Sequence, residues 1–139
     1  MDDKLIFNCF SIEDISIGME VSYSQTITDA DVKSFAGISG DNNPVHMSNE
    51  YAEKSHFKKR IAHGLMSASY FSVLFGTKIP GYGCVYISQL LLFKNPVYLN
   101  DTVTATVTVI EKNIEMFFKT VCRVKNKVVL DGEAEIYVP

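Results

Sequence analysis

The sequence predicts an α+β protein in which an antiparallel sheet wraps around one long central helix. The segment HGLMSASYFSVLFGT, residues 63–77, has no charged residue from Leu65 to Phe75. A helix there would be apolar on nearly every side, and such helices are buried. The chain after residue 82 consists of β-branched and aromatic segments divided by turn residues, which is typical of antiparallel strands. A long sheet curled around the helix would provide the cover that the helix needs.

The first half of the chain predicts one strand and two short helices. The strand is MEVSYSQTI, Met19–Ile27, rich in β-branched and aromatic residues. A helix then begins in TDAD, with Thr28 as N-cap and Asp31 three positions later, where a capping box usually has Glu or Gln. It ends at the glycines of Gly37–Gly40. After a loop, SNEYAEKSHF predicts a second helix with Ser48 as its N-cap.

The second half predicts the buried helix followed by about four strands. In the helix, Ala68, Ser69 and Ser72 form a narrow strip of small residues that would let a sheet or a ligand approach closely. CVYISQLLLFK predicts the next strand. In DTVTATVTVIEK, apolar residues alternate with threonines at period two, as in a strand with one buried face. MFFKTVCRV and KVVLDGEAEIYV predict a hairpin that turns at KNK.

Length and composition predict one soluble domain spanning residues 1–139. Hydrophobic residues make up 47% and charged residues 21% of the chain, and the net charge is -3. This charge argues against a nucleic-acid-binding protein, which would normally be basic. No apolar run is long enough to span a membrane, and Met1–Phe10 lacks the features of a signal peptide. Cys9, Cys84 and Cys122 form no CxxC pair, so we expect free, buried thiols and a cytoplasmic protein.

The segment SGDNNPVH, Ser39–His46, is the first candidate for chemistry. Pro44 favours an extended conformation at Asn43 and pre-sets a turn, so the side chains of Asp41 and His46 can approach a common point. A carboxylate and an imidazole together can hold one water molecule and transfer protons to and from it, with Asn43 orienting either group. The alternative is a purely structural turn, because Asp and Asn are favoured in turns and caps.

The second candidate is AHGLM, where the buried helix begins. The N–H groups at a helix N-terminus lack partners within the helix, and Gly64 would let a ligand carbonyl approach them without meeting a side chain. This arrangement suits an oxyanion hole. The alternative is an ordinary glycine at a helix start. We expect His63 to be a packing or capping group.

The run HFKKR, His56–Arg60, places three cations just before the buried helix. Such a run is most often a solvated surface. The functional alternative is a contact with the phosphates of a coenzyme or with an acidic carrier protein.

Together these segments resemble the MaoC-like, (R)-specific enoyl-CoA hydratase family, also called hydratase 2. The family signature G-D-x-N-P-[LIV]-H, with its preceding aromatic residue and following small residue, is similar to FAGISGDNNPVHMSNEYA, Phe35–Ala52. The likeness continues through IAHGLMSASYF and FKNPVYLNDTVTATVTV, and SIGMEVSYSQTITDADVKSFA fits the family's opening. The resemblance covers nearly the whole chain.

The resemblance implies the hot-dog fold, homodimers whose sheets join edge to edge, and reversible syn hydration of a trans-2-enoyl-CoA to the (R)-3-hydroxyacyl-CoA. By match to the motif, Asp41 and His46 are the acid/base pair, Asn43 supports them, and the N–H of Gly64 binds the thioester oxygen. No metal or redox cofactor is implied; coenzyme A is part of the substrate. The acyl chain is expected beside the buried helix, near Ser72 and Phe75, and the bulk of Phe75 favours a short chain.

Three other functions remain open at this point. The first is the same chemistry on a carrier-bound substrate, by a (3R)-hydroxyacyl-ACP dehydratase. The second is an acyl-CoA thioesterase, because hot-dog folds also host thioesterases. The third is a non-catalytic acyl-CoA-binding module, which would have no need of an acid/base pair.

Overall fold

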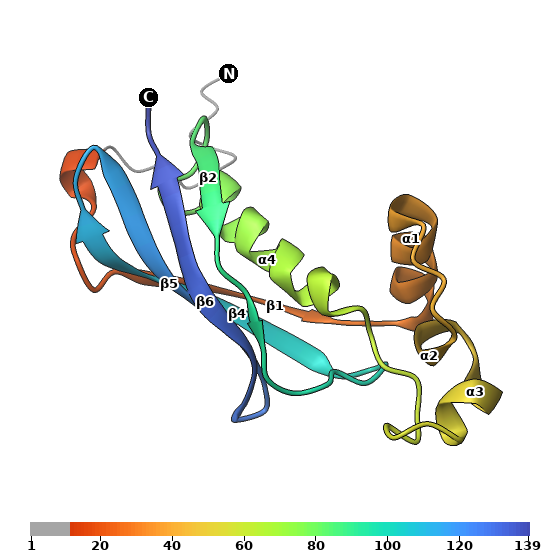
Figure 1. Cartoon of the computed structure of the whole chain (residues 1–139). Helices are drawn as coiled ribbons and strands as arrows, with labels where there is room; N and C mark the ends of the chain where they lie inside the picture. Colours follow the sequence, from red (N-terminus) through yellow and green to blue (C-terminus); the bar gives the residue numbers. More distant parts are fainter. Residues whose placement is uncertain (1–11) are drawn as a thin grey trace.

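The computed structural model describes residues 12–139. The expectations about a signal peptide in Met1–Phe10 and about Cys9 fall outside the described residues. A six-stranded antiparallel sheet forms the body of the molecule, helix α4 (Gly64–Thr77) lies along it, and three short helices gather at one end (Figure 1). This is the predicted α+β architecture, a sheet curled against one long helix.

The strands follow the order β1-β4-β5-β6-β2 across the sheet, and the short β3 also pairs with β6. Each predicted strand segment contributes to the sheet, and the KNK hairpin joins β5 to β6 as expected. The small and β-branched residues of β4 that alternate with threonines are at most 1% exposed, so their face packs into the core. The strand bounds are β1 Glu20–Thr26, β2 Val85–Gln89, β3 Leu92–Phe93, β4 Thr102–Lys112, β5 Glu115–Val124 and β6 Lys127–Tyr137.

The predicted strand CVYISQLLLFK is divided into β2 and β3. Gly132 of β6 explains the break, because a Cβ atom at this position would lie 1.8 Å from the carbonyl oxygen of Leu90. The segment between β2 and β3 therefore passes directly against the backbone of β6, which only glycine permits. The Leu90 N–H donates to the carbonyl of Glu133 across the same crossing.

Helix α4 buries one face against the sheet and leaves another exposed. Phe71, Leu74 and Phe75 are at most 1% exposed, and the helix contacts β1, β4, β5 and β6. Leu65, however, is 56% exposed, and Ser72 is exposed on the same side. Residues 12–139 therefore do not provide the expected cover on every side of this helix, because one sheet reaches only one side of it.

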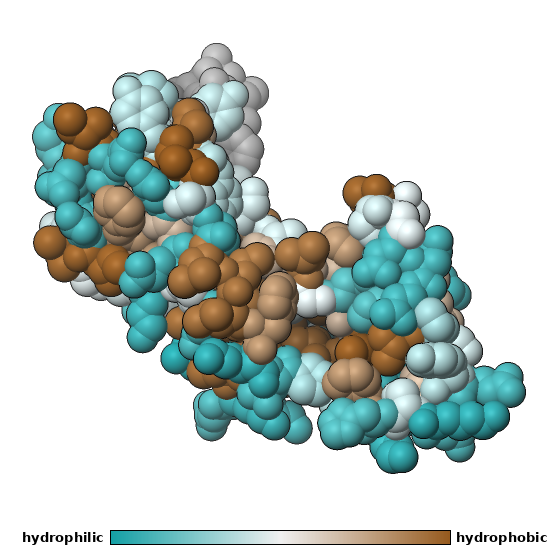
Figure 2. Space-filling model, viewed as in Figure 1, coloured by the Kyte–Doolittle hydropathy of each residue, from teal (hydrophilic) through white to brown (hydrophobic). Residues whose placement is uncertain are grey.

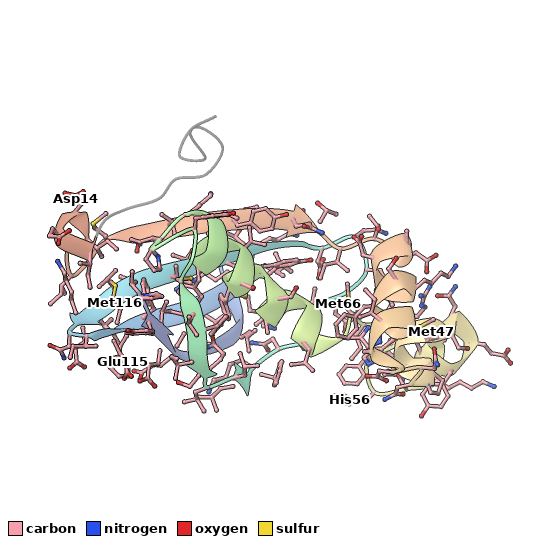
Figure 3. All side chains as sticks on the ribbon, turned by 90° about the horizontal axis from the view of Figure 1, so that it is seen from above. Asp14, Met47, His56, Met66, Glu115 and Met116 are labelled. Atoms are coloured by element: carbon pink, nitrogen blue, oxygen red, sulfur yellow. The ribbon has the colours of Figure 1, made fainter. Side chains whose placement is uncertain are left out.

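The first three α-helices are α1 (Asp29–Ser39), α2 (Pro44–Met47) and α3 (Asn49–Glu53), and a short 3-10 helix at Ile12–Asp14 precedes β1. The capping box expected from Thr28 and Asp31 is formed, and Ser48 caps α3. The sequence prediction missed α2, which lies inside the expected loop. In Figure 3, Met47 and His56 lie at this helical end, Met66 lies where α4 meets it, and Glu115 lies far away along the sheet. In the part of the chain that the structure describes, no helix is long and apolar enough to cross a membrane.

Candidate active site

The loop between α1 and α2 is organised by its own side chains. The Ser39 hydroxyl accepts the N–H of Asp41 (3.1 Å), and Asp41 Oδ1 accepts the N–H of Asn43 (3.1 Å). Asn43 Oδ1 in turn accepts the N–H of Val45 (3.2 Å), which caps α2. These turn interactions, which the residue types predicted, fix where the loop presents its carboxylate. The Asn43 side chain acts in the structure as a cap, and its described hydrogen bond is to the N–H of Val45 and not to the Asp41 carboxylate or the His46 ring.

Asp41 and His46 face each other without touching. The distance from Asp41 Oδ2 to His46 Nε2 is 4.0 Å, too long for a direct hydrogen bond. A water molecule about 2.8 Å from both atoms can sit beside the pair and bond to each. The carboxylate is open to solvent, whereas the imidazole side chain is only 11% exposed.

The orientation of the His46 ring is set by its other nitrogen. Nδ1 lies 2.8 Å from the carbonyl oxygen of Ile61, and a carbonyl can only accept, so Nδ1 carries the hydrogen. Nε2 is then the unprotonated nitrogen that faces Asp41. Burial lowers the pKa of His46, and the neighbouring His63 lowers it further, against the opposing effects of the Ile61 carbonyl and Asp41. The neutral ring is therefore favoured, and it can accept a proton from water.

His63 is a buried neighbour of the pair, only 3% exposed. Its ring stacks on that of His46 with centroids 4.0 Å apart, and it also packs against Phe35. Its Nε2–H donates to the backbone carbonyl of Asp41 (2.9 Å). The expected packing role is thus present, whereas a side-chain cap on α4 is not. His63, which immediately precedes α4, therefore contacts both members of the pair, through the ring of His46 and the backbone of Asp41.

Gly64 is the first residue of α4. The first N–H groups of a helix have no partner within it, and the His63 side chain caps none of them. A Cβ atom at position 64 would lie 2.6 Å from the ring of Phe93, so the glycine makes room for this ring. The helix start thus offers backbone donors beside His46, as an oxyanion hole requires.

A cavity of about 360 Å³ connects these groups, and both His46 and Gly64 line it. Figure 2 shows the surface hollowed between the strand segment that carries β3 and the end formed by α1–α3. Its wall is mainly apolar and includes Phe57, Ala62, Phe93, Val97, Val129 and Leu130. An apolar cavity with a few polar groups at one place is typical of a small-molecule site.

Arg60, the last cation of HFKKR, is part of the site's framework. Its side chain is only 9% exposed; Nε donates to the carbonyl of His46 (2.6 Å), and Nη1 pairs with Asp29 Oδ1 (2.7 Å). Arg60 therefore ties the start of α1 to α2. The reading of the whole run as a solvated surface is wrong for Arg60, because its guanidinium is enclosed between these helices. Lys58 and Lys59 are exposed, as expected.

We expect Arg60→Lys to lower kcat about tenfold and to leave KM nearly unchanged. An ammonium group cannot reproduce the two directed bonds of the guanidinium fork, so the His46 carbonyl loses its donor and the ring loses its fixed position. Steady-state kinetics and thermal unfolding would measure the effect. Lys33→Met is the matched control, because Lys33 is the other partner of Asp29 (2.8 Å) and makes no contact with His46 in the described contacts. Equal kinetics in the two variants would contradict a positioning role for Arg60.

Asp41, His46 and His63 bring one ligand-type atom each within 4.8 Å of one another. The two imidazole rings are stacked with only 29° between their planes. A histidine ligand points the lone pair in its ring plane at the metal, and nearly parallel stacked rings cannot both point at one ion. The arrangement suits proton transfer better than metal coordination.

The structure leaves Ser72 and Phe75 apart from the cavity. Ser72 is exposed on α4, and Phe75 is buried in the core, edge-on to the rings of Tyr86 (5.1 Å) and Phe118 (4.8 Å). Their roles as acyl-binding residues stay predictions. The cavity instead includes Ser67, one turn after Gly64, which sequence reasoning did not single out. Its only signal was a polar residue at a position of the helix that faces the core.

Comparisons with known proteins agree with this geometry. Residues 14–132 match the MaoC like domain family. The chain is 46% identical to an (R)-specific enoyl-CoA hydratase from Rhodospirillum rubrum over 99% of this chain and 96% of that protein. It is 42% identical to a 3-hydroxybutyryl-CoA dehydratase from Methylorubrum extorquens, covering 91% and 83% of the two chains. The solved structure of an (R)-hydratase from Aeromonas caviae superposes with a TM-score of 0.88 at 34% identity, covering 91% of this chain and 99% of that one. The chain belongs to the MaoC-like domain family, as its signature motif predicted, and it has the hot-dog fold.

Proposed function

We propose that this protein is an (R)-specific enoyl-CoA hydratase, which reversibly hydrates a short- to medium-chain trans-2-enoyl-CoA to the (R)-3-hydroxyacyl-CoA. The observation that carries the proposal is the facing pair of Asp41 and His46, with His46 and the uncapped start of α4 at Gly64 lining one apolar cavity. The relatives in Rhodospirillum rubrum and Methylorubrum extorquens align with nearly the whole chain, and their names support the same reaction.

In this mechanism a water molecule bonds to both Asp41 and His46 and attacks C3 of the enoyl thioester. One of the pair accepts the proton that the water releases, and a proton is delivered to C2 from the same face. As the C3–O bond forms, negative charge develops on the thioester oxygen. The Gly64 N–H donates to that oxygen, and removal of one such donor typically costs roughly 3 kcal/mol. The reaction uses no metal and no redox cofactor.

The acyl chain is proposed to lie in the apolar cavity, along Val97, Val129 and Leu130. Hydrocarbon surface gains about 25 cal/mol for each Å² removed from water, so these side chains favour an acyl group over the polar pantetheine arm. Ser72 and Phe75 do not line this cavity, and their contact with the acyl chain remains a prediction.

The test is hydration of crotonyl-CoA and of longer trans-2-enoyl-CoA thioesters, with loss of the enoyl absorbance and the stereochemistry of the product as readouts. We expect the (R) product, and an (S) product would contradict the proposal. Faster turnover of acyl-ACP than of acyl-CoA would identify the carrier-dependent dehydratase instead. Release of free thiol from a saturated acyl-CoA would identify a thioesterase, and binding without turnover a non-catalytic module.

We also propose that the protein is a homodimer joined through the outer edge of β2. This strand lies at one end of the sheet, so its outer backbone groups have no partner strand within the described chain. The large apolar side chains of β2 and β3 are 38–55% exposed, and Figure 2 shows hydrophobic side chains gathered over this segment. An exposed apolar edge strand favours pairing with another chain. A second copy would also cover the exposed side of α4.

Ile87→Glu is expected to convert the dimer into a monomer and to lower its thermal stability. Ile87 of β2 is 48% exposed, and a buried carboxylate at a symmetric interface would meet its own copy. Sedimentation velocity would measure the assembly state. Ile114→Glu is the matched control, because Ile114 is 80% exposed between β4 and β5, away from this edge. Unchanged assembly in Ile87→Glu, or a monomeric wild type, would contradict the proposal.

Two further expectations belong to the same proposal. The whole chain, residues 1–139, acts as one MaoC-like domain, and the protein works in the cytoplasm. Cys84 and Cys122 are free cysteines, which is compatible with a reducing compartment.

A further inference from the structure

Ser67 is a buried polar residue in a mainly apolar cavity. It lies one helical turn after Gly64, is 2% exposed, and lines the cavity shared with His46 and Gly64. Its Oγ has no hydrogen-bond partner among the described residues. Buried hydroxyl groups in folded proteins are almost always paired, so an unpaired one calls for a specific explanation.

Other hydroxyl groups on α1 and α4 form hydrogen bonds within their own helix, unlike that of Ser67. Ser69 donates to the carbonyl of Met66, Thr77 to that of Val73, and Ser39 to that of Phe35. Each of these satisfies its hydroxyl within its own helix. The Ser67 hydroxyl has no such bond, so it remains available to a group that enters the cavity.

The depth of Ser67 indicates which part of a substrate it meets. The backbone carbonyl of Ser67 accepts the thiol of Cys122 in β5 (3.5 Å), which places this turn of α4 directly on the sheet. Gly64 lies one turn nearer to the helix start, where the thioester oxygen binds in the proposed mechanism. Val129 and Leu130 line the same cavity as Ser67. The hydroxyl therefore faces the acyl chain rather than the reacting atoms.

We propose that Ser67 is a specificity-determining residue of the acyl cavity. Its hydroxyl bonds to a retained water molecule when the acyl chain is short, and to an oxygen when the acyl group carries one at that depth. A longer hydrocarbon chain displaces the water and leaves the hydroxyl unpaired. This inference rests on the proposed hydratase function, and it assigns the enzyme to short or oxygen-bearing acyl groups.

The test compares the wild type with Ser67→Ala, using kcat/KM for crotonyl-CoA, trans-2-octenoyl-CoA, and octenoyl analogues in which an ether oxygen replaces one methylene at successive positions. We expect Ser67→Ala to raise the ratio of kcat/KM for octenoyl-CoA to that for crotonyl-CoA about tenfold. In this variant the longer chain no longer displaces a water molecule from a buried hydroxyl or leaves that hydroxyl without a hydrogen bond. In the wild type, one ether position should be preferred over the all-carbon chain, and this preference should vanish in Ser67→Ala.

Ser69→Ala is the matched control, two residues along the same helix with its hydroxyl already paired. It should leave both ratios unchanged. Ser67→Cys, which keeps nearly the same shape with a weakly bonding thiol, replaces the alanine variant if that variant is unstable. If the wild type and the Ser67 variants all hydrate crotonyl-CoA and have equal chain-length and ether preferences, the proposed role of Ser67 is overturned. Absence of hydration activity in the wild type would instead overturn the proposed function.

Discussion

Asp41→Asn is expected to lower kcat for crotonyl-CoA hydration by about 10²- to 10⁴-fold while the fold stays intact. The amide cannot accept a proton, and its NH₂ group places a donor where the carboxylate offered an acceptor to the water. The loop should survive the change, because an amide oxygen can replace Asp41 Oδ1 as the acceptor of the Asn43 N–H. Half of the Asp41 side chain is exposed, so the substitution buries no new unpaired group.

Single-turnover and steady-state kinetics, together with circular dichroism and thermal unfolding, would measure this loss. Glu50→Gln is the matched control, because it neutralises an exposed carboxylate on the neighbouring α3. It should change neither activity nor stability. A folded Asp41→Asn protein with full activity would exclude the proposed acid/base pair.

His46→Gln is expected to cause a loss of similar size, about 10²- to 10⁴-fold in kcat. Glutamine can still donate to the Ile61 carbonyl that holds the imidazole Nδ1–H, but it offers no basic nitrogen to the water. The side chain also stacks on His63, so some loss of thermal stability accompanies the change. Because the two residues act as a unit, Asp41→Asn/His46→Gln should be little worse than either single variant. Multiplicative losses in the double variant would show that the two side chains act separately.

The pH dependence of the wild type gives an independent test of His46. Burial lowers the pKa of this ring below the ordinary value of about 6.5, so the neutral form persists to lower pH. As the pH falls through the lowered pKa, Nε2 becomes protonated and can no longer accept a proton from water. We therefore expect kcat/KM to decline on the acid side with a midpoint below about 6.5. A midpoint above that value would contradict the assignment of His46 as a neutral group.

The elements of the fold follow closely from local sequence patterns. The alternation in DTVTATVTVIEK gave β4 with its buried face, and the Thr28–Asp31 pair gave the start of α1. These features depend on contacts within a few residues, so a single sequence can reveal them. The break between β2 and β3 was not predicted, because it depends on Gly132, some 40 residues later in the chain. The exposed side of α4 was not predicted either, since hydropathy indicates that a helix needs cover but not what provides it.

The candidate site divides in the same way. Asp41, His46 and Gly64 were selected by residue type, spacing and resemblance, and the structure brings all three to one place. Arg60 was assigned to a solvated run, and His63 was regarded only as a packing or capping group. Their contacts with the backbone of His46 and of Asp41 join residues 14 and 22 positions apart. A single sequence gives no sign of such pairings.

The sequence by itself determined the chemistry available to this protein, because a carboxylate, an imidazole and a glycine at a helix start stand in a motif of fixed spacing. Only the tertiary structure decided the state in which that chemistry is presented. Burial lowers the pKa of His46, the Ile61 carbonyl selects its tautomer, and Arg60 holds its backbone. Ser67 likewise differs from the other serines of α4 only in the folded protein, where it is buried in the cavity with its hydroxyl unpaired among the described residues. The physical reason is that desolvation and hydrogen-bond pairing depend on which distant segments enclose a side chain, and the chain establishes this only when it folds.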